Sequence, residues 1–568
     1  MSEKVKEKIE FLYKGQDTEK IFSEIMSIIK NFKNQRKRKE FFDQEDVILI
    51  TYGDQFKGND KNPLFYLKQF CDEYIKDIIN TIHILPFFPY SSDDGFSVID
   101  YKKVDPDLGD WEDIKELSKE YRLMFDFVCN HISSKSDWFL GYLNGKEEYK
   151  DYFIEADPNE DLSKVVRPRA LPLLTAFDTK NGKKYVWTTF SEDQIDLNYK
   201  NPKVLIEMIK ILLYYIEQGA DIIRLDAIGF LWKEIGTSCI HLEQTHKVVQ
   251  LFRDIIQLTA KEVKIITETN VPHKDNISYF GDGYNEAHMV YQFPLPPLVL
   301  YTFMCGDSRV FTNWAKNIKP ISEETAFFNF LASHDGVGLN PLRGIVSEDE
   351  INKLVELTIK RGGLVSYKYN PDGSKSPYEL NISYFNALSD EDEREEIKIR
   401  KFLNAYSIAL AMQGVPGIYI HSILGSQNYH EGVKITGQNR TINREKFEYS
   451  KIKEELDIKN NLRYRVYNGI KELLKIRKQY SAFHPNSKQD ILEISRDVIA
   501  TLRSSDKGKI LALNNITNKK LVLKIDKEKI KCTKGEIISL IDKKIIITND
   551  DSIEISLDPY EFLWLHYA

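Results

Sequence analysis

The sequence predicts an α/β fold, a (β/α)8 TIM barrel with two inserted subdomains and a C-terminal antiparallel β domain, and three features of it carry this prediction. Eight short apolar segments alternate with helix-period sequence from residue 46 onward, which is typical of parallel strands covered by helices. Two connections between these segments are too long for simple loops. From residue 486 onward, strand-like segments follow one another without helices between them.

The predicted elements divide the chain into an N-terminal helical extension (1–45), a barrel (46–485) and a β domain (486–568). Apolar residues recur at helical spacing in the extension, for example at Ile21, Ile25 and Ile28. The insertions are expected at 129–200, after the third strand, and at 336–395, after the seventh. The predicted barrel strands are 47–52, 81–86, 122–127, 221–226, 263–268, 287–293, 327–333 and 417–421.

Composition excludes several classes of protein. Lys and Arg number 79 against 86 Asp and Glu, a net charge of −7, which argues against a nucleic-acid partner. No apolar stretch is long enough to span a membrane, and the first residues show no secretory signal. The five cysteines form no CxxC pair, so neither a disulfide framework nor a zinc site is expected. We therefore expect a cytoplasmic protein without a membrane partner.

Ionisable residues gather at the ends of four predicted strands, where a barrel builds its active site. A single acidic strand end is more often a helix N-cap, and a pair such as Arg224 and Asp226 can simply brace a barrel. Four clusters in barrel order favour an active site instead. They contain Asp126 with His131, Arg224 with Asp226, Glu268, and His334 with Asp335.

These clusters lie in segments that resemble the four sequence regions of the α-amylase superfamily. The segments are DFVCNH (126–131), IIRLDA (222–227), ITET (266–269) and LASHD (331–335). The resemblance implies a retaining α-glucoside enzyme in which Asp226 is the nucleophile, Glu268 the general acid/base and Asp335 the stabiliser of the transition state. Retention requires one carboxylate that attacks and one carboxylic acid that protonates the leaving oxygen. Arg224 can keep the attacking group ionised.

Further segments resemble the sucrose phosphorylase group of that superfamily, in which phosphate replaces water and α-glucose 1-phosphate is formed. They include 83–101, the RPR tripeptide 167–169, 187–197, 233–242 and 293–300. The expected partners are thus a glucoside and inorganic phosphate. The resemblance assigns phosphate binding to Arg169, whose planar guanidinium suits an oxyanion.

The resemblance also implies a set of residues around the glucose ring. Phe96 and Phe190 alternatively belong to the core, and His131 alternatively braces its neighbours. The implied contacts are polar ones from Asp93, His131, Gln194, Arg224, His334 and Arg444, and apolar packing from Phe96 and Phe190.

The chain departs from the sucrose-specific members in the short segment 339–350, at Phe230 and at Asn270. It looks closer to glucosylglycerate phosphorylases and to sucrose 6-phosphate phosphorylases, so 2-O-α-glucosylglycerate is the expected substrate. Sucrose, sucrose 6-phosphate, and a hydrolase or transglucosidase remain alternatives. Arg343 or Lys233 could meet an acceptor's negative charge, or be ordinary surface charges. No cofactor or metal is expected, although a calcium ion near Asn130 stays open.

Overall fold

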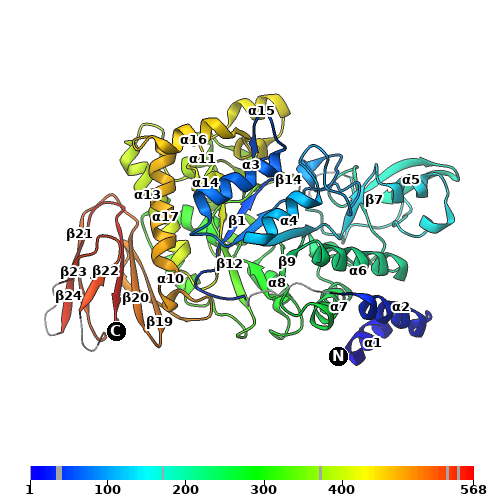
Figure 1. The fold of residues 1–568 in the computed structure, drawn as a ribbon, viewed down its shortest axis with the longest axis horizontal. Coiled ribbons are helices and arrows are strands. Elements are labelled where there is room, and N and C mark those ends of the chain that lie inside the picture. The colour runs from blue at the N-terminus through cyan, green and yellow to red at the C-terminus, as the bar shows by residue number, and fades with distance from the viewer. Residues whose placement is uncertain (1, 34–40, 169–171, 370–373, 533–535, 547–550) are drawn as a thin grey trace.

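The computed structural model describes residues 2–33, 41–168, 172–369, 374–532, 536–546 and 551–568. At its centre, eight parallel strands close into a barrel in chain order (Figure 1). Each strand overlaps one of the predicted apolar segments, so the predicted fold class is confirmed. The strands are β1 (Ile48–Thr51), β3 (Thr81–Ile84), β4 (Arg122–Phe127), β9 (Ala220–Leu225), β10 (Lys264–Thr267), β11 (Met289–Tyr291), β12 (Ala326–Phe330) and β16 (Val415–Tyr419).

Helices cover the outside of the barrel, and local sequence explains where they begin. The Asp110 side chain caps α4 and forms a capping box with Asp113. Asn201 caps α6, and Pro202 occupies its first turn. Apart from the helices of the two long connections described next, the α-helices of the described barrel region are α3 (Pro63–Phe70), α4 (Trp111–Glu120), α6 (Pro202–Glu217), α7 (Glu243–Thr259), α8 (His273–Ile277), α9 (Leu295–Cys305), α10 (Arg309–Ala315), α13 (Glu395–Ala411), α14 (Ile420–Ile423), α15 (His430–Thr436), α16 (Tyr449–Asp457) and α17 (Leu462–Arg477).

Two long connections carry strands of their own. In the connection after β4, β5 pairs antiparallel with β8 and β6 pairs with β7. In the connection after β12, β13, β15 and β14 form a three-stranded sheet. Their elements are β5 (His131–Ser133), α5 (Asp137–Leu143), β6 (Leu174–Thr179), β7 (Gly182–Trp187), β8 (Gln194–Asp196), β13 (Val337–Gly338), α11 (Glu348–Lys360), β14 (Leu364–Tyr369), β15 (Lys375–Asn381) and α12 (Tyr384–Ala387). Short strands β2 (Phe56–Lys57) and β17 (Phe447–Glu448) pair with each other.

The C-terminal part is an antiparallel β domain beside α13. Arg503 joins the two, because its buried guanidinium donates to the carbonyl of Ala411, the last residue of α13, at 2.9 Å. A cation there complements the helix dipole and satisfies a free carbonyl. A six-stranded sheet contains β18 (Lys488–Ser495), β19 (Val498–Ser505), β20 (Gly508–Asn515), β25 (Phe562–Tyr567), β22 (Ile537–Ser539) and β23 (Ile545–Ile546), and a second sheet contains β21 (Leu521–Asp526) and β24 (Ser552–Leu557).

The first described residues form two helices, α1 (Ser2–Leu12) and α2 (Thr18–Asn31), which pack against α7 and α6. An ion pair of 2.7 Å joins Lys8 to Asp254 of α7. The buried Tyr13 hydroxyl donates to the Tyr199 carbonyl at 2.9 Å. These two helices are therefore docked on the outside of the barrel.

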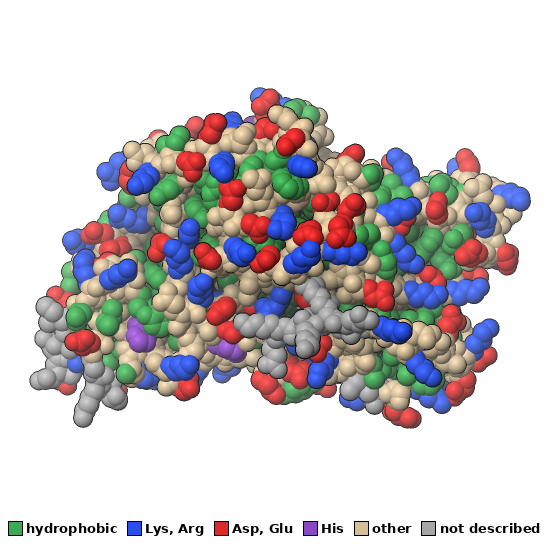
Figure 2. Space-filling model, viewed as in Figure 1, with side chains coloured by type: hydrophobic (Ala, Val, Ile, Leu, Met, Phe, Trp, Pro, Cys, Tyr) green, Lys and Arg blue, Asp and Glu red, His purple; other side chains and the backbone are tan. Residues whose placement is uncertain are grey.

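Acidic and basic side chains are interspersed over the described part of the face shown in Figure 2. This mixture agrees with the near balance of charges in the sequence. None of the helices in the described ranges combines the length and apolarity that a bilayer crossing requires.

A buried ion pair fixes the first insertion to the barrel. Lys233, in the connection after β9, binds the Asp196 carboxylate of β8 and donates to the Asn130 Oδ1 atom at 2.7 Å. Asp196 also accepts bonds of 2.7 Å from the Thr189 backbone N–H and hydroxyl. Lys233 is 6% exposed and Asp196 is fully buried, so each charge depends on the other for compensation.

Replacing Lys233 by Met leaves the Asp196 carboxylate buried without its cation. We expect Lys233→Met to lower the free energy of unfolding by about 3 kcal/mol, measured as a lower urea midpoint by tryptophan fluorescence. The control is Lys200→Met, which removes an exposed pair of 2.7 Å with Glu234 and should cost less than about 1 kcal/mol. Equal midpoints for the two variants would show that the buried pair does not hold the insertion.

Candidate active site

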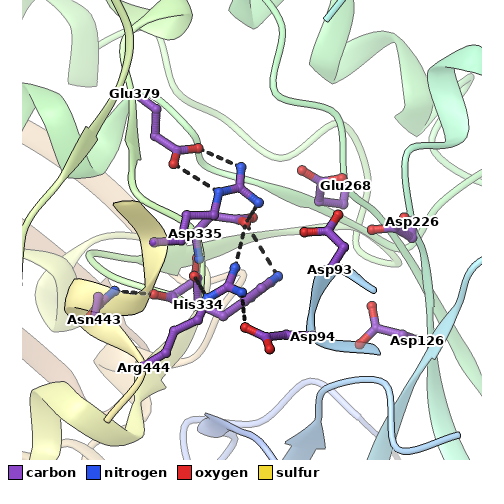
Figure 3. A network of polar contacts seen from close by, with 12 residues as sticks. Asp93, Asp94, Asp126, Asp226, Glu268, His334, Asp335, Glu379, Asn443 and Arg444 are labelled. Carbon is purple, nitrogen blue, oxygen red and sulfur yellow. Dashed lines mark hydrogen bonds and ion pairs between the residues drawn. The ribbon is translucent and has the colours of Figure 1, made fainter. Parts of the chain in front are cut away.

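Three carboxyl groups line one cavity at the carboxyl ends of the barrel strands. Asp226 directly follows β9, Glu268 directly follows β10, and Asp335 lies in the connection after β12. Their side chains are 11, 15 and 26% exposed, and the cavity measures about 580 Å³. In Figure 3, Asp226 and Glu268 lie on one side and Asp335 on the other. The fold thus brings together the three acids that the sequence singles out.

The Arg224 guanidinium is buried beneath the cavity, between carboxylates. Its side chain lies opposite Asp126 in the register of β9 and β4, and the two form an ion pair. It donates to Asp226 at 2.8 Å, whereas Glu268 is 3.9 Å away. The Tyr291 hydroxyl accepts a third bond, of 3.0 Å. Arg224 therefore has a stronger hold on Asp226 than on Glu268.

This unequal contact decides which carboxyl group carries the proton. Burial is the main cause that raises the pKa of Glu268; Arg224 opposes the rise, and repulsion from Asp335 adds to it. Burial and Glu268 also raise the pKa of Asp226, while Arg224 opposes the rise. Two buried carboxyls this close to each other cannot both ionise easily. Burial raises the pKa of Asp226 to about 8, so the pKa shifts alone do not separate the two acids. The contact geometry does: Arg224 donates to Asp226 at 2.8 Å and lies 3.9 Å from Glu268, which favours the negative charge on Asp226 and the proton on Glu268.

Asp335 is surrounded by cations. Burial alone would raise its pKa, but the Arg440 guanidinium at 2.6 Å, together with the Arg444 guanidinium, holds it well below the ordinary range. Arg440 is itself fixed by two bonds to Glu379 of β15, of 2.7 and 3.0 Å. Asp335 therefore stays ionised at neutral pH.

Most of the predicted sugar-binding residues line the same cavity as the acids. The Phe96 ring is stacked on His334 at 5.0 Å and 8°, and Phe190 lies 5.2 Å from His131. Burial lowers the pKa of His131 to about 4 and that of His334 to about 3, so both imidazoles are neutral hydrogen-bonding groups. The lining includes Asp93, Phe96, His131, Phe190, Gln194, Arg224 and His334.

Arg444 differs from this group. It is absent from the described lining of the cavity and only 5% exposed. Its guanidinium pairs with Asp94, donates to the His334 carbonyl at 2.8 Å and lies 3.9 Å from Asp335 (Figure 3). The structure places Arg444 outside the cavity lining, where it fixes the loop that carries His334 and Asp335.

Asp93 is held in an unusual backbone conformation. Its φ angle is 56° and that of Asp94 is 48°, a left-handed conformation that costs about 1 kcal/mol or more for a residue with a side chain. Gln194 of β8 donates to Asp93 at 3.3 Å. The first insertion therefore helps to aim a strained carboxylate into the cavity.

Several residues of the site are not singled out by the sequence analysis. Arg440 and Glu379 fix Asp335, and Asp193 accepts bonds from four serines, among them Ser97 at 2.9 Å. Arg440 lies in the NRTINR segment 439–444, so a charged segment was the available signal. The partners come from other connections, which spacing along the chain does not reveal.

A second cavity, of about 660 Å³, opens beside the first on the side of Glu268. The two share Pro168, Phe190, Ala227, Glu268, Asn270 and Tyr378 as walls. Arg167 lines the second cavity, and Arg169 lies outside the described residues. A molecule bound here would face the acid rather than the nucleophile.

The two cations suggested by the sequence for an acceptor's charge are engaged elsewhere. Lys233 is buried against Asp196 and Asn130, and Arg343 pairs with Glu348. Neither belongs to the described lining of the second cavity. Their charges were visible in the sequence, but their partners were not.

No cluster of three or more His, Cys, Asp or Glu side chains within the described ranges is arranged to hold a metal ion. The Asn130 side-chain oxygen accepts a hydrogen bond of 2.7 Å from the Lys233 ammonium.

Comparisons with known proteins agree with this geometry. Residues 52–342 match the family model "Alpha amylase, catalytic domain". The chain is 46% identical to a glucosylglycerate phosphorylase of Escherichia coli (strain K12), over the whole of both chains. It is 48% identical to one of Spirochaeta thermophila, over 92% of this chain and 90% of the other.

Solved structures show the same architecture. The crystal structure of sucrose 6F-phosphate phosphorylase from Thermoanaerobacter thermosaccharolyticum superposes with a TM-score of 0.74 at 26% identity, covering 90% of this chain and 98% of that one. The chain belongs to the α-amylase family and, within it, to the glucoside phosphorylases.

Proposed function

We propose that this enzyme transfers the glucosyl unit of 2-O-α-glucosylglycerate to inorganic phosphate, giving α-glucose 1-phosphate and glycerate. The observation that carries the chemistry is the unequal contact of Arg224 with Asp226 and Glu268, at 2.8 and 3.9 Å. It prepares one ionised and one protonated carboxyl group at a single cavity. A retaining double displacement requires this pair.

In the first step, Asp226 attacks the anomeric carbon and forms a glucosyl ester. Glu268 gives its proton to the departing glycerate oxygen as the glycosidic bond breaks. Positive charge develops on the sugar ring in the transition state, and the ionised Asp335 stabilises it. The pKa of Asp335, held low by Arg440, keeps this charge in place at neutral pH.

In the second step, phosphate replaces glycerate on the Glu268 side. Glu268, now a carboxylate, takes a proton from the phosphate while a phosphate oxygen attacks the anomeric carbon and the ester bond to Asp226 breaks. The second inversion restores the α configuration. We assign phosphate binding to Arg169, as the resemblance implies, because an anion near three carboxyl groups requires a fixed cation.

The glucose ring is held by the residues around the first cavity. We assign hydroxyl contacts to Asp93, His131, Gln194 and His334, whose polar atoms come from four different connections or strands. Phe96 and Phe190 cover apolar faces of the ring. Arg224 and Arg444 act through the carboxylates they fix, Asp226 and Asp94.

The choice of glycerate as leaving group rests on the relatives. Those named glucosylglycerate phosphorylase are 46–48% identical across nearly the whole chain. Relatives named sucrose 6(F)-phosphate phosphorylase or sucrose phosphorylase are 28–29% identical. The difference supports glucosylglycerate over the two sucrose substrates.

The reaction is tested by following products from glucosylglycerate with and without phosphate. We expect α-glucose 1-phosphate in place of free glucose when phosphate is present, and little turnover of sucrose or sucrose 6-phosphate.

Arg169→Ala should raise the KM for phosphate and the share of free glucose among the products, because water needs no cation. Free glucose as the main product of the unchanged enzyme with saturating phosphate would identify a hydrolase.

Glu268→Gln tests the acid through its leaving group and its pH dependence. Fluoride needs no protonation, so the variant should lose far more activity toward glucosylglycerate than toward α-glucosyl fluoride, by a factor of about 100 or more. In the unchanged enzyme, activity toward glucosylglycerate should fall as pH rises through the raised pKa of Glu268. The glucosyl fluoride reaction is the internal control, because the first step with this donor should not lose activity as the pH rises. Equal losses for both donors would contradict the assignment.

A further inference from the structure

The second cavity has a charge pattern that the proposed reaction does not by itself explain. Among its described lining residues, Arg167 and Lys368 are cations, and the shared Glu268 is the single acid. Burial lowers the pKa of His241, another lining residue, to about 4, so this ring is neutral. The cavity is therefore more positive than the neighbouring glucose cavity, which contains four carboxyl groups: Asp93, Asp226, Glu268 and Asp335.

Lys368 is the better placed of the two cations. It comes from β14 of the second insertion and is half-buried, whereas Arg167 is exposed. Its ammonium donates to the Asn340 side-chain oxygen at 3.3 Å, and Asn340 lines the same cavity. Asn340 thus orients the ammonium without neutralising it.

The surroundings of Lys368 supply little compensating charge. No carboxylate within the described ranges forms an ion pair with it; the nearby Glu348, which raises its pKa, is paired with Arg343. Burial, and then repulsion from Arg343, lower the pKa of Lys368 below its ordinary value. A desolvated ammonium beside a second cation is stabilised by an incoming anion.

The remaining walls limit what that anion can be. Phe230, Ile240 and Val271 give the cavity an apolar side, while Asn270, whose Oδ1 atom is buried without a partner in the described structure, offers a free acceptor. A short hydroxy acid fits this combination. Its carboxylate would meet the cation, and its hydroxyl would donate to the amide.

We propose that Lys368 binds the carboxylate of the acceptor, and so selects a short hydroxy acid such as glycerate over neutral polyols and sugars. This inference rests on the proposed function, because it concerns the leaving group of that reaction. It assigns specificity to the second insertion, whereas the reacting carboxyl groups belong to the barrel. The geometry gives Lys368 no role in breaking the glycosidic bond.

The test compares glycerate with glycerol, which has the same carbon skeleton without the charge. With glucose 1-phosphate as donor, phosphate release gives KM and kcat for each acceptor. Lys368→Met should raise the KM for glycerate about ten- to a hundredfold, the usual value of a charge-assisted hydrogen bond. The ratio of the two KM values should shift by a similar factor, and Lys368→Arg should restore most of it.

Lys375→Met is the matched control. It removes one positive charge from the neighbouring strand β15, at an exposed position outside the described lining of the cavity, and should leave the ratio of KM values unchanged. An unchanged ratio in Lys368→Met would overturn the inference, as would equal losses for glycerate and glycerol, which would indicate a packing role.

The inference and the proposed function fail in different ways. If the unchanged enzyme releases no phosphate from glucose 1-phosphate with any acceptor, the proposed function is wrong. Calorimetric titration of glycerate into the unchanged protein and into Lys368→Met then still decides the inference, since a carboxylate site predicts weaker binding by the variant. Equal binding by the two proteins would overturn it.

Discussion

Arg224 lies at the end of β9 with its guanidinium buried between Asp126, Asp226 and the more distant Glu268. A cation in this place would be unstable without those carboxylates, and they would repel one another without it. Its direct bond to Asp226 makes two similar acids unequal. The rest of the site depends on that inequality, because one acid must attack while the other donates a proton. The register of the barrel strands sets Arg224 opposite Asp126, and this ion pair fixes the position of the guanidinium.

The two insertions add what the barrel lacks. The first contributes His131 and Gln194 to the glucose cavity and is fixed by the buried contact of Lys233 with Asp196. The second contributes Glu379, which orients Arg440 against Asp335, and Lys368 in the adjoining cavity. Charge is thus divided between the cavities. Carboxylates surround the sugar that becomes positive in the transition state, and cations face the side where anions arrive and leave.

The barrel and its acids were predictable, because each strand is a mainly apolar segment and ionisable residues follow several of them. Asp226 and Glu268 follow β9 and β10 directly, so parallel strands bring them together wherever the chain closes. The partners of these acids were not predictable. Arg440 meets Glu379 and Asp335 only after the second insertion folds, and Lys368 stands in a segment without a motif. The sequence shows the charges of Lys233 and Arg343 but not the partners, Asp196 and Glu348, that the structure gives them.

The central claim is that a glucosyl ester forms on Asp226 before phosphate arrives. A slowly reacting fluorinated α-glucosyl fluoride should trap this ester, and peptide mass spectrometry after proteolysis should locate it. We expect one added fluoroglucosyl mass on the peptide that contains Asp226, and its loss when phosphate is added, with an α-linked phosphate ester as product. A sugar attached to another residue, or a β-linked product formed without any adduct, would contradict the account.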